Sequence, residues 1–208
     1  MIPQHNRGAE RTARAHSGSP WLQKESANLV SASRLVFACV WVAVFFSGRR
    51  HSVVLGVIAV CGAASDFLDG RIARRTDSAS HFGRWFDGIA DIVFILAALS
   101  CEAYAGIIPC YLPALVAASF AQYAADSVLI RGSMVPVKSR FGHQAGILNY
   151  IIVMVLAWAP WLRFPPKLIH FSAPLIALFY LLAISERLLF YETARRRPVT
   201  SIRPAADG

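Results

Sequence analysis

Apolar residues dominate six stretches of the chain, and most charged residues lie at the ends of these stretches or between them. The stretches cover approximately residues 29–47, 52–72, 85–104, 107–130, 144–162 and 168–190. Each is about 17 to 25 residues long, the length that an α-helix needs to cross a lipid bilayer. The pattern therefore predicts an all-α integral membrane protein with six transmembrane helices in a single domain.

Four aspartates interrupt or adjoin the apolar sequence of the second and third stretches: Asp66, Asp69, Asp87 and Asp91. Asp66 and Asp69 are i and i+3, and Asp87 and Asp91 are i and i+4, spacings that place side chains on one face of a helix. Two such helices facing each other would gather four carboxylates in a small volume. Buried carboxylates are costly unless a partner, a polar cavity or a cation compensates them. Oxygen ligands alone favour hard divalent ions such as Mg²⁺, Mn²⁺ or Ca²⁺, so we expect a two-metal centre.

The composition agrees with a membrane protein, because 56% of the residues are hydrophobic and the mean hydropathy is +0.47. Residues 1–27 are basic and contain no apolar core, which argues against a signal peptide and for a disordered arm. We expect residues 28–192 to form the six-helix domain. Residues 193–208 are expected to form a basic C-terminal tail.

The net charge of +9 invites comparison with nucleic-acid-binding proteins, but the distribution of the charge argues for a membrane. If the N-terminus is cytoplasmic, most of the 21 Lys and Arg residues lie on the cytoplasmic side, and only Arg49, Arg50, Arg163 and Lys167 lie outside. Such an asymmetry follows the positive-inside rule. We therefore expect a multi-pass protein of the cell membrane, with both termini and the aspartates on the cytoplasmic side. Membrane lipids, and no nucleic acid, are the expected neighbours.

The four aspartates belong to a longer pattern, D-x2-D-G-x2-A-R-x8-G-x3-D-x3-D, which runs from Asp66 to Asp91. This pattern resembles the signature of the CDP-alcohol phosphotransferases (phosphatidyltransferases), membrane enzymes of phospholipid synthesis. An Asp-Gly pair alone usually marks a turn, and an Asp pair alone usually marks a solvated helix face. Neither reading explains eight fixed residues at this joint spacing. The segment Asn28-Leu-Val-Ser31 also resembles the family's nucleotide-contacting entry to its first helix.

The resemblance implies a fold, an assembly and a set of catalytic groups. Six helices would surround a polar cavity at the cytoplasmic membrane surface, and two chains would form a homodimer. The metal ligands would be Asp66, Asp69, Asp87 and Asp91, holding two Mg²⁺ or Mn²⁺ ions per active site. Asp91 would also be the catalytic base that accepts the proton of the attacking alcohol, with Asp87 placed to bridge the metals.

The residues that the resemblance assigns to the CDP-linked donor are mostly small. Gly70 and Ala73 would let the nucleotide approach the helix backbone, although small residues in membrane helices also serve helix packing. Arg74 carries a fork of donors suited to phosphate, although an arginine beside a membrane helix can simply extend to the interface. The full donor set is Asn28, Ser31, Gly70, Ala73, Arg74, Ser80 and Gly83.

A basic loop before the fifth apolar stretch resembles a segment in which relatives often carry a Gly-Lys pair. Its candidate acceptor-binding residues are Lys138, Arg140 and His143, with His143 standing where Lys is usual. An equally good interpretation is a cytoplasmic loop whose charges only set the topology.

Two departures from family subgroups bear on the acceptor. Phosphatidylglycerol-phosphate synthases usually have Pro and Lys after the third and fourth aspartates, where this chain has Gly88 and Ile92. Members that transfer to inositol phosphate carry basic residues after a Tyr in the fourth helix, and none follows Tyr123 closely. These departures argue against a phosphorylated acceptor and leave serine, unphosphorylated inositol or another small alcohol open.

The function implied is the metal-dependent transfer of a phosphatidyl group from CDP-diacylglycerol to a small polar alcohol, with release of CMP. A related alternative is an aminoalcohol phosphotransferase, in which a CDP-alcohol donates its head group to diacylglycerol. A different class is a cation transporter, because carboxylates inside a membrane also mark ion paths.

Overall fold

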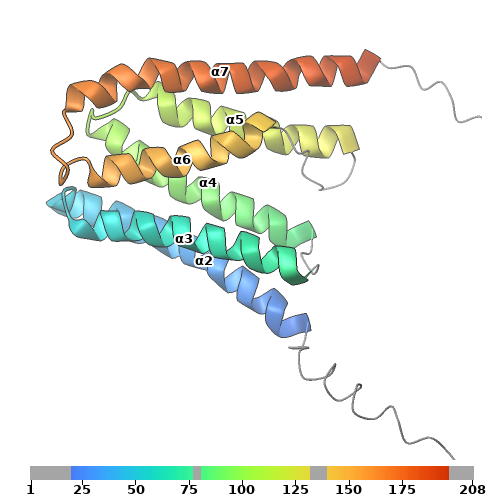
Figure 1. Cartoon of the computed structure of the whole chain (residues 1–208), viewed down its shortest axis with the longest axis horizontal. Helices are drawn as coiled ribbons and strands as arrows, with labels where there is room; N and C mark the ends of the chain where they lie inside the picture. Colours follow the sequence, from blue (N-terminus) through green and yellow to red (C-terminus); the bar gives the residue numbers. More distant parts are fainter. Residues whose placement is uncertain (1–19, 77–80, 132–139, 197–208) are drawn as a thin grey trace, which may run out of the picture. The chain divides into compact units, whose positions relative to one another are not determined.

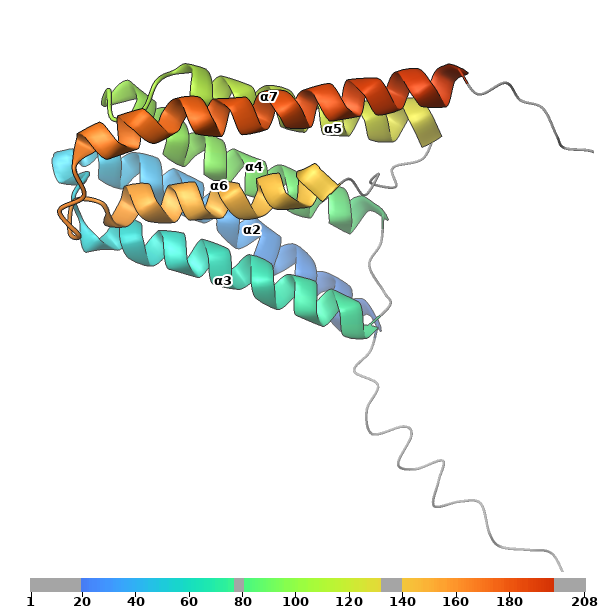
Figure 2. The same ribbon diagram turned by 45° about the horizontal axis from the view of Figure 1, so that its top comes forward.

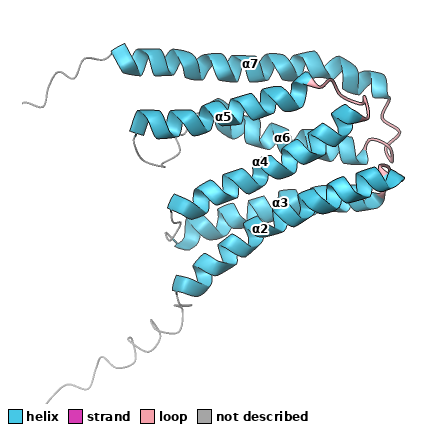
Figure 3. Cartoon of the chain, turned by 180° about the vertical axis from the view of Figure 1, so that it is seen from behind, coloured by secondary structure: helices cyan, strands magenta, loops and turns pink. Residues whose placement is uncertain are grey.

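The computed structural model describes residues 20–76, 81–131 and 140–196, and side chains within 31–65, 83, 85–126, 144–165 and 167–189. These residues form helices and contain no strand (Figure 3). The order is α2 (Pro20–Val44), a π-helical turn η1 (Phe45–Arg49), α3 (Val53–Thr76), α4 (His81–Tyr104), α5 (Tyr111–Arg131), α6 (Arg140–Trp158) and α7 (Pro166–Arg196) (Figure 1). Each predicted apolar stretch coincides with one of these α-helices. The all-α prediction is therefore confirmed.

Two segments of the described chain are long and apolar enough to cross a membrane, Ser31–Arg49 and Lys167–Leu189. Val53–Ser65 and Gln144–Trp158 are shorter apolar helical segments. These segments lie within the part of the chain whose side chains the structure describes, and α3 itself continues to Thr76 through the first half of the aspartate motif. The six-span topology, its orientation and the polar cavity stay predictions.

The helix ends are determined by a few local hydrogen bonds. Ser52 begins α3, because its hydroxyl oxygen accepts a bond of 3.2 Å from the amide of Val54. Gly106 ends α4 with a positive φ of 72°, a conformation that favours glycine. Its amide donates to the carbonyl of Ala103, and the amide of Ile107 donates to the carbonyl of Glu102, both at 3.0 Å. These two bonds satisfy carbonyls that the helix end would otherwise leave without a partner.

The chain divides into two compact units, residues 1–97 and 98–208. Unit 1 contains α2, η1, α3 and most of α4, and unit 2 contains the end of α4 with α5, α6 and α7. In unit 1, α2 and α3 lie side by side (Figure 2). The turn between them passes through Gly48, whose φ of 80° is non-helical.

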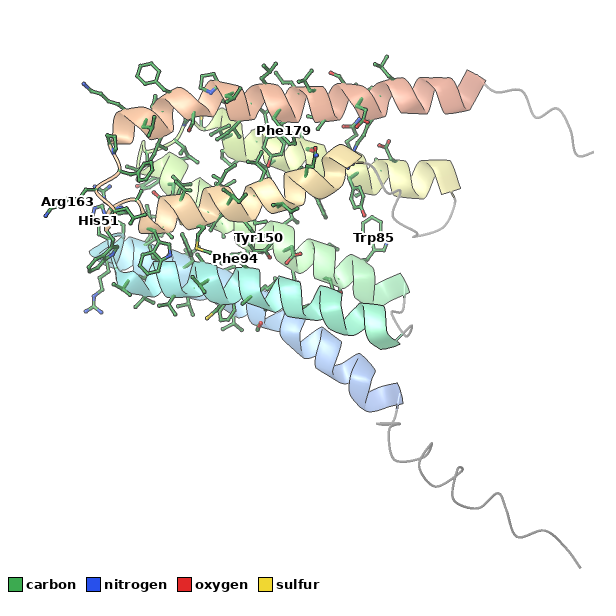
Figure 4. The ribbon with its side chains drawn as sticks, viewed as in Figure 1. His51, Trp85, Phe94, Tyr150, Arg163 and Phe179 are labelled. Atoms are coloured by element: carbon green, nitrogen blue, oxygen red, sulfur yellow. The ribbon has the colours of Figure 1, made fainter. Side chains whose placement is uncertain are left out.

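The core of unit 1 is centred on Phe94 of α4, which is labelled in Figure 4 and is fully buried. Its ring meets the ring of Trp41 edge to face, with centroids 5.9 Å apart and planes at 86°. From α3, Gly62 approaches the same ring. Phe94 thus joins all three helices of unit 1.

Unit 2 is held together by α7, which packs against both α5 and α6. The hydroxyl of Tyr180 on α7 donates to the side-chain carbonyl of Asn149 on α6, and both residues are buried. The amide of Gln122 on α5 donates to the carbonyl of Ile184 at 3.1 Å. Other positions of α7 expose large apolar side chains, as expected for a helix that faces lipid: Leu168, Phe171, Leu175, Leu178, Leu181, Leu182, Leu188 and Leu189.

Candidate active site

One face of α2 changes from polar to apolar along its length. Ser31, Arg34, Ala38 and Trp41 follow one another at i, i+3, i+7 and i+10, and all four are buried. This spacing places them in one stripe along the helix. A buried serine and a buried arginine in an otherwise apolar stripe each require a polar partner on a neighbouring helix.

The facing stripe on α4 supplies these partners in the same order. The hydroxyl of Ser31 donates to Oδ1 of Asp87, and Nη1 of Arg34 lies 2.9 Å from Oδ1 of Asp91. Farther along, Trp41 meets Phe94. Because the residue numbers increase together on both helices, α2 and α4 run in the same direction. Their polar ends and their apolar ends therefore coincide.

Arg34 also reaches the third helix of unit 1. Its Nε lies 3.4 Å from the hydroxyl oxygen of Ser65 on α3, a long hydrogen bond. The Ser65 hydroxyl in turn donates to the carbonyl of Gly62 at 2.8 Å. Ser65 directly precedes Asp66 in the chain. The guanidinium therefore lies where the first half of the aspartate motif begins on α3.

Burial differs sharply between the two partners of the ion pair. The Arg34 side chain is 1% exposed, whereas that of Asp91 is 24% exposed. A guanidinium removed from water needs a nearby anion, and Nη1 of Arg34 meets Oδ1 of Asp91 as an ion pair rather than as an aligned hydrogen bond. Asp91 provides that anion and remains accessible to a ligand. Asp87 is likewise half-buried.

The structure brings together three of the residues predicted for the site, namely Asp87, Asp91 and Ser31. The remaining predicted residues are placed only in part. Gly83 is half-buried on α4, and Asp66, Asp69, Gly70, Ala73 and Arg74 lie on α3, Asn28 on α2, and Arg140 and His143 on α6. Except for Gly83, the side chains of these residues lie outside the described part of the structure, and Ser80 and Lys138 lie outside it altogether.

Ser31 and Arg34 have contacts that the sequence did not predict. Ser31 was expected to contact the donor nucleotide; its hydroxyl bonds to Asp87, and the donor contact stays a prediction. Arg34 was counted only among the charges that set topology, yet it is buried against Asp91. Its position three residues after Ser31, inside an apolar stretch, was the available signal. A charge there needs a compensating partner in the same way as the aspartates do.

The described residues fit a hard divalent cation as far as they extend. Carboxylate oxygens are the ligands that Mg²⁺ and Mn²⁺ prefer, and Asp87 and Asp91 present theirs one helical turn apart. No group of three or more His, Cys, Asp or Glu side chains gathers among the residues described. Asp66 and Asp69, the other two expected ligands, have side chains outside that part.

A second polar cluster lies in unit 2, between α5 and α7. The guanidinium carbon of Arg187 lies 4.9 Å from the centre of the Tyr123 ring, and Arg187 is buried. Asp126 and Glu186 interact with the same guanidinium electrostatically. From the sequence, a cation near Tyr123 was expected only among the residues that follow it on the same helix. The structure shows that α7 supplies one.

Parts of the chain are similar in sequence to enzymes of phospholipid synthesis. The "Probable phosphatidylglycerophosphate synthase" of Mycobacterium tuberculosis is 34% identical over 94 residues, which cover 43% of this chain and 45% of that protein. The "CDP-diacylglycerol--serine O-phosphatidyltransferase" of Helicobacter pylori is 34% identical over 77 residues, covering 37% and 32% of the two chains. The "Cardiolipin synthase (CMP-forming)" of Streptomyces coelicolor is 30% identical over 129 residues, covering 60% and 56%. The matches thus span from about a third to a little over half of these relatives.

A family model describes more of the chain than any of these relatives does. The model for CDP-alcohol phosphatidyltransferase matches residues 24–185, which include the whole aspartate motif. Proteins of this family are membrane proteins and are in general metal-dependent. The match begins within α2 and includes all of α3 and α4, so it covers Ser31 and Arg34 as well as Asp87 and Asp91. The chain therefore belongs to the CDP-alcohol phosphatidyltransferase family.

Proposed function

We propose that this protein transfers a phosphatidyl group from CDP-diacylglycerol to a small polar alcohol and releases CMP. The observation that carries the proposal is the pair of accessible carboxylates, Asp87 and Asp91, held by Ser31 and Arg34. They lie in a chain whose family performs this class of transfer. The relative from Helicobacter pylori carries CDP-diacylglycerol in its name, which supports it as the donor.

In the proposed reaction, the oxygen of the acceptor hydroxyl forms a bond to the phosphorus that carries the diacylglycerol. The bond from that phosphorus to the oxygen of the CMP phosphate breaks, and CMP leaves. The proton of the acceptor goes to Asp91. The ion pair with Arg34 requires Asp91 to carry its negative charge, and the charged form is the one that accepts a proton.

Asp66, Asp69, Asp87 and Asp91 are the residues that would hold two Mg²⁺ or Mn²⁺ ions. Bound there, the ions would neutralise the diphosphate of the donor and favour departure of CMP. Within the chain, Ser31 orients Asp87, and Arg34 orients Asp91. The residues proposed to contact the donor are Asn28, Ser31, Gly70, Ala73, Arg74, Ser80 and Gly83, and those proposed to contact the acceptor are Lys138, Arg140 and His143.

We further propose that the site faces the cytoplasm in a six-span, homodimeric membrane protein. The concentration of Lys and Arg on the side of the aspartate motif supports this orientation. CDP-linked substrates and Mg²⁺ are available on that side. Family membership favours an enzyme over the cation transporter that the carboxylates alone also allowed.

The acceptor is proposed only as a class. The names of the relatives point to different reactions, since one is a serine O-phosphatidyltransferase and another a probable phosphatidylglycerophosphate synthase. Arg187 beside Tyr123 supplies a cation that the sequence around Tyr123 lacks. Phosphorylated and unphosphorylated alcohols therefore both belong among the substrates to be tested.

The test is a turnover assay on the purified chain in lipid nanodiscs. Radiolabelled CDP-diacylglycerol and Mg²⁺ or Mn²⁺ are incubated with serine, inositol, glycerol, glycerol 3-phosphate and phosphatidylglycerol in turn, and CMP and new lipid are quantified. A parallel series offers CDP-choline or CDP-ethanolamine with diacylglycerol. CMP release with a matching lipid product in the first series supports the proposal. Turnover only in the second series would favour the aminoalcohol phosphotransferase, and none in either would refute both.

A further inference from the structure

Among the residues whose side chains the structure describes, Arg34 is the most deeply buried charge beside the proposed active site, and the proposed reaction gives it no direct contact with substrate. At 1% exposure, its head group is withdrawn from water. An arginine that only sets topology or extends to the membrane surface keeps its guanidinium hydrated. The burial of Arg34 therefore requires a different explanation.

The contacts of Arg34 supply that explanation, because two of its nitrogens reach two different helices. Nη1 lies 2.9 Å from Asp91 on α4, and Nε lies 3.4 Å from the hydroxyl of Ser65 on α3. Both nitrogens belong to one rigid plane, so their directions are fixed relative to each other. One planar group therefore links the Asp91 carboxylate on α4 to the Ser65 hydroxyl on α3.

The neighbouring contact on α2 has the same effect on the other aspartate of α4. Ser31, one turn before Arg34, bonds to Asp87. One face of α2 thus orients both carboxylates of α4. Reacting and ligating groups need to be held within about 0.5 Å of the productive geometry, and partners behind them provide this.

We propose that Arg34 is a positioning residue of the active centre, fixing the Asp91 carboxylate of α4 relative to α3 through its paired contacts with Asp91 and Ser65. This inference rests on the proposed function, because it gives Asp91 its task. It adds a residue outside the aspartate motif to the machinery of transfer. It also predicts a distinct kinetic signature, since a group that orients Asp91 affects the chemical step rather than binding of the donor.

The decisive variant is Arg34→Lys. It keeps the positive charge but lacks the planar guanidinium whose separate nitrogens contact α3 and α4. We expect kcat to fall about tenfold to a hundredfold, the usual loss when a group behind a ligand is removed. Measured at saturating Mn²⁺, so that the metal site is filled in both proteins, the KM for CDP-diacylglycerol should stay within about threefold. Calorimetric titration with Mn²⁺ alone, without substrate, should show about tenfold weaker binding.

Two further variants define the effect. Ser65→Ala removes the contact of Arg34 with α3 and leaves the ion pair with Asp91. The kcat should therefore fall about threefold, the loss expected when one weak neutral hydrogen bond is removed. Arg50→Gln removes an exposed arginine whose Nε bonds to the neighbouring His51. This control should leave kcat, the KM for the donor and the affinity for Mn²⁺ unchanged. Thermal unfolding in detergent reports whether each variant is folded. If Arg34→Lys does not fold, the Ser65→Ala result decides.

The outcomes separate this inference from the proposed function. Wild-type kcat and Mn²⁺ affinity in Arg34→Lys would overturn the positioning role. A raised KM for the donor with unchanged kcat would also overturn it, by showing that Arg34 binds the donor phosphate. If the wild-type chain turns over no CDP-linked donor, the proposed function fails, and the Mn²⁺ titrations still decide whether Arg34 orients Asp91. An absence of Mn²⁺ binding in the wild type would overturn both.

Discussion

Gly62 of α3 lies against the ring edge of Phe94 of α4 so closely that a Cβ at position 62 would be 3.0 Å from Cε1 and 3.3 Å from Cζ of the ring. Phe94 is fully buried and also packs on Trp41, so its ring has little room to move. The carbonyl of Gly62 accepts the bond from Ser65, the residue that Arg34 contacts. The close approach of α3 to α4 thus lies directly behind the proposed active site.

Gly62→Ala should therefore lower the free energy of unfolding by about 1–3 kcal/mol, the usual range for forcing extra volume into a packed core. Unfolding of the purified protein by titration with a denaturing detergent would measure it. Gly146→Ala is the matched control, because it lies in a helix and a Cβ there meets no atom within 4 Å. That variant should be neutral or stabilised by up to about 1 kcal/mol. Equal effects at both positions would contradict the proposed close packing.

Asp91→Asn and Asp87→Asn should fail in different ways. Asn keeps the size and one oxygen of the carboxylate but has neither its charge nor its basicity. Asp91→Asn should reduce kcat about 10²–10⁴-fold, the typical contribution of a general base, while the donor still binds. Asp87→Asn should first weaken binding of Mn²⁺ and, with it, of the donor. Calorimetric titrations beside the turnover assay would distinguish the two losses. Substantial turnover by Asp91→Asn would mean that the acceptor loses its proton elsewhere.

Removal of divalent ions should abolish transfer and also lower thermal stability. Ions that bind only the folded chain stabilise it according to their concentration, by about 2.7 kcal/mol at a hundred times the dissociation constant. Dialysis against EDTA, followed by addition of Mg²⁺ or Mn²⁺, should therefore restore both activity and the unfolding temperature. Ca²⁺ serves as a comparison for the effect of binding alone. Full activity after exhaustive chelation would exclude the two-metal centre.

The contact between Arg187 and Tyr123 should contribute measurably to unit 2. A cation over an aromatic ring is worth about 0.5–2 kcal/mol, with the larger values where water is excluded. Tyr123→Leu should therefore be less stable than Tyr123→Phe, which keeps the ring and removes only the hydroxyl. Unfolding in denaturing detergent compares the two variants. If they are equally stable, the ring face contributes nothing to holding Arg187.

The sequence predicted those features that depend on neighbouring residues. Apolar runs identified all six α-helices, and the i, i+4 spacing of Asp87 and Asp91 placed both on one helix, as observed. The ends were less accurate, because Pro20 and Arg196 lie in polar sequence that continues α2 and α7 beyond their apolar parts. Residues 20–27 were expected to belong to a disordered arm, but α2 begins at Pro20. The wider domain boundaries and the six-span topology stay predictions.

Contacts between distant residues could not be predicted in the same way. Arg34 and Asp91 meet only because α2 and α4 pack in one particular alignment, and no local pattern encodes that choice. Arg187 reaches Tyr123 for the same reason, from a helix far along the chain. An unexpected charge in an apolar stripe can be noticed in the sequence, but its partner is found only by packing the helices.

The alignment of α2 on α4 has a mechanical consequence. Three contacts follow one another along the parallel helices α2 and α4: Ser31 with Asp87, Arg34 with Asp91, and Trp41 with Phe94. If α2 moved along α4 by one helical turn, about 5.4 Å, all three contacts would be broken together. The buried contact between Trp41 and Phe94 therefore helps to fix the position of Asp87 and Asp91 along α2. Replacing Trp41 by a smaller side chain would therefore affect catalysis without any contact with substrate, because Asp87 and Asp91 would shift with α4 relative to α2.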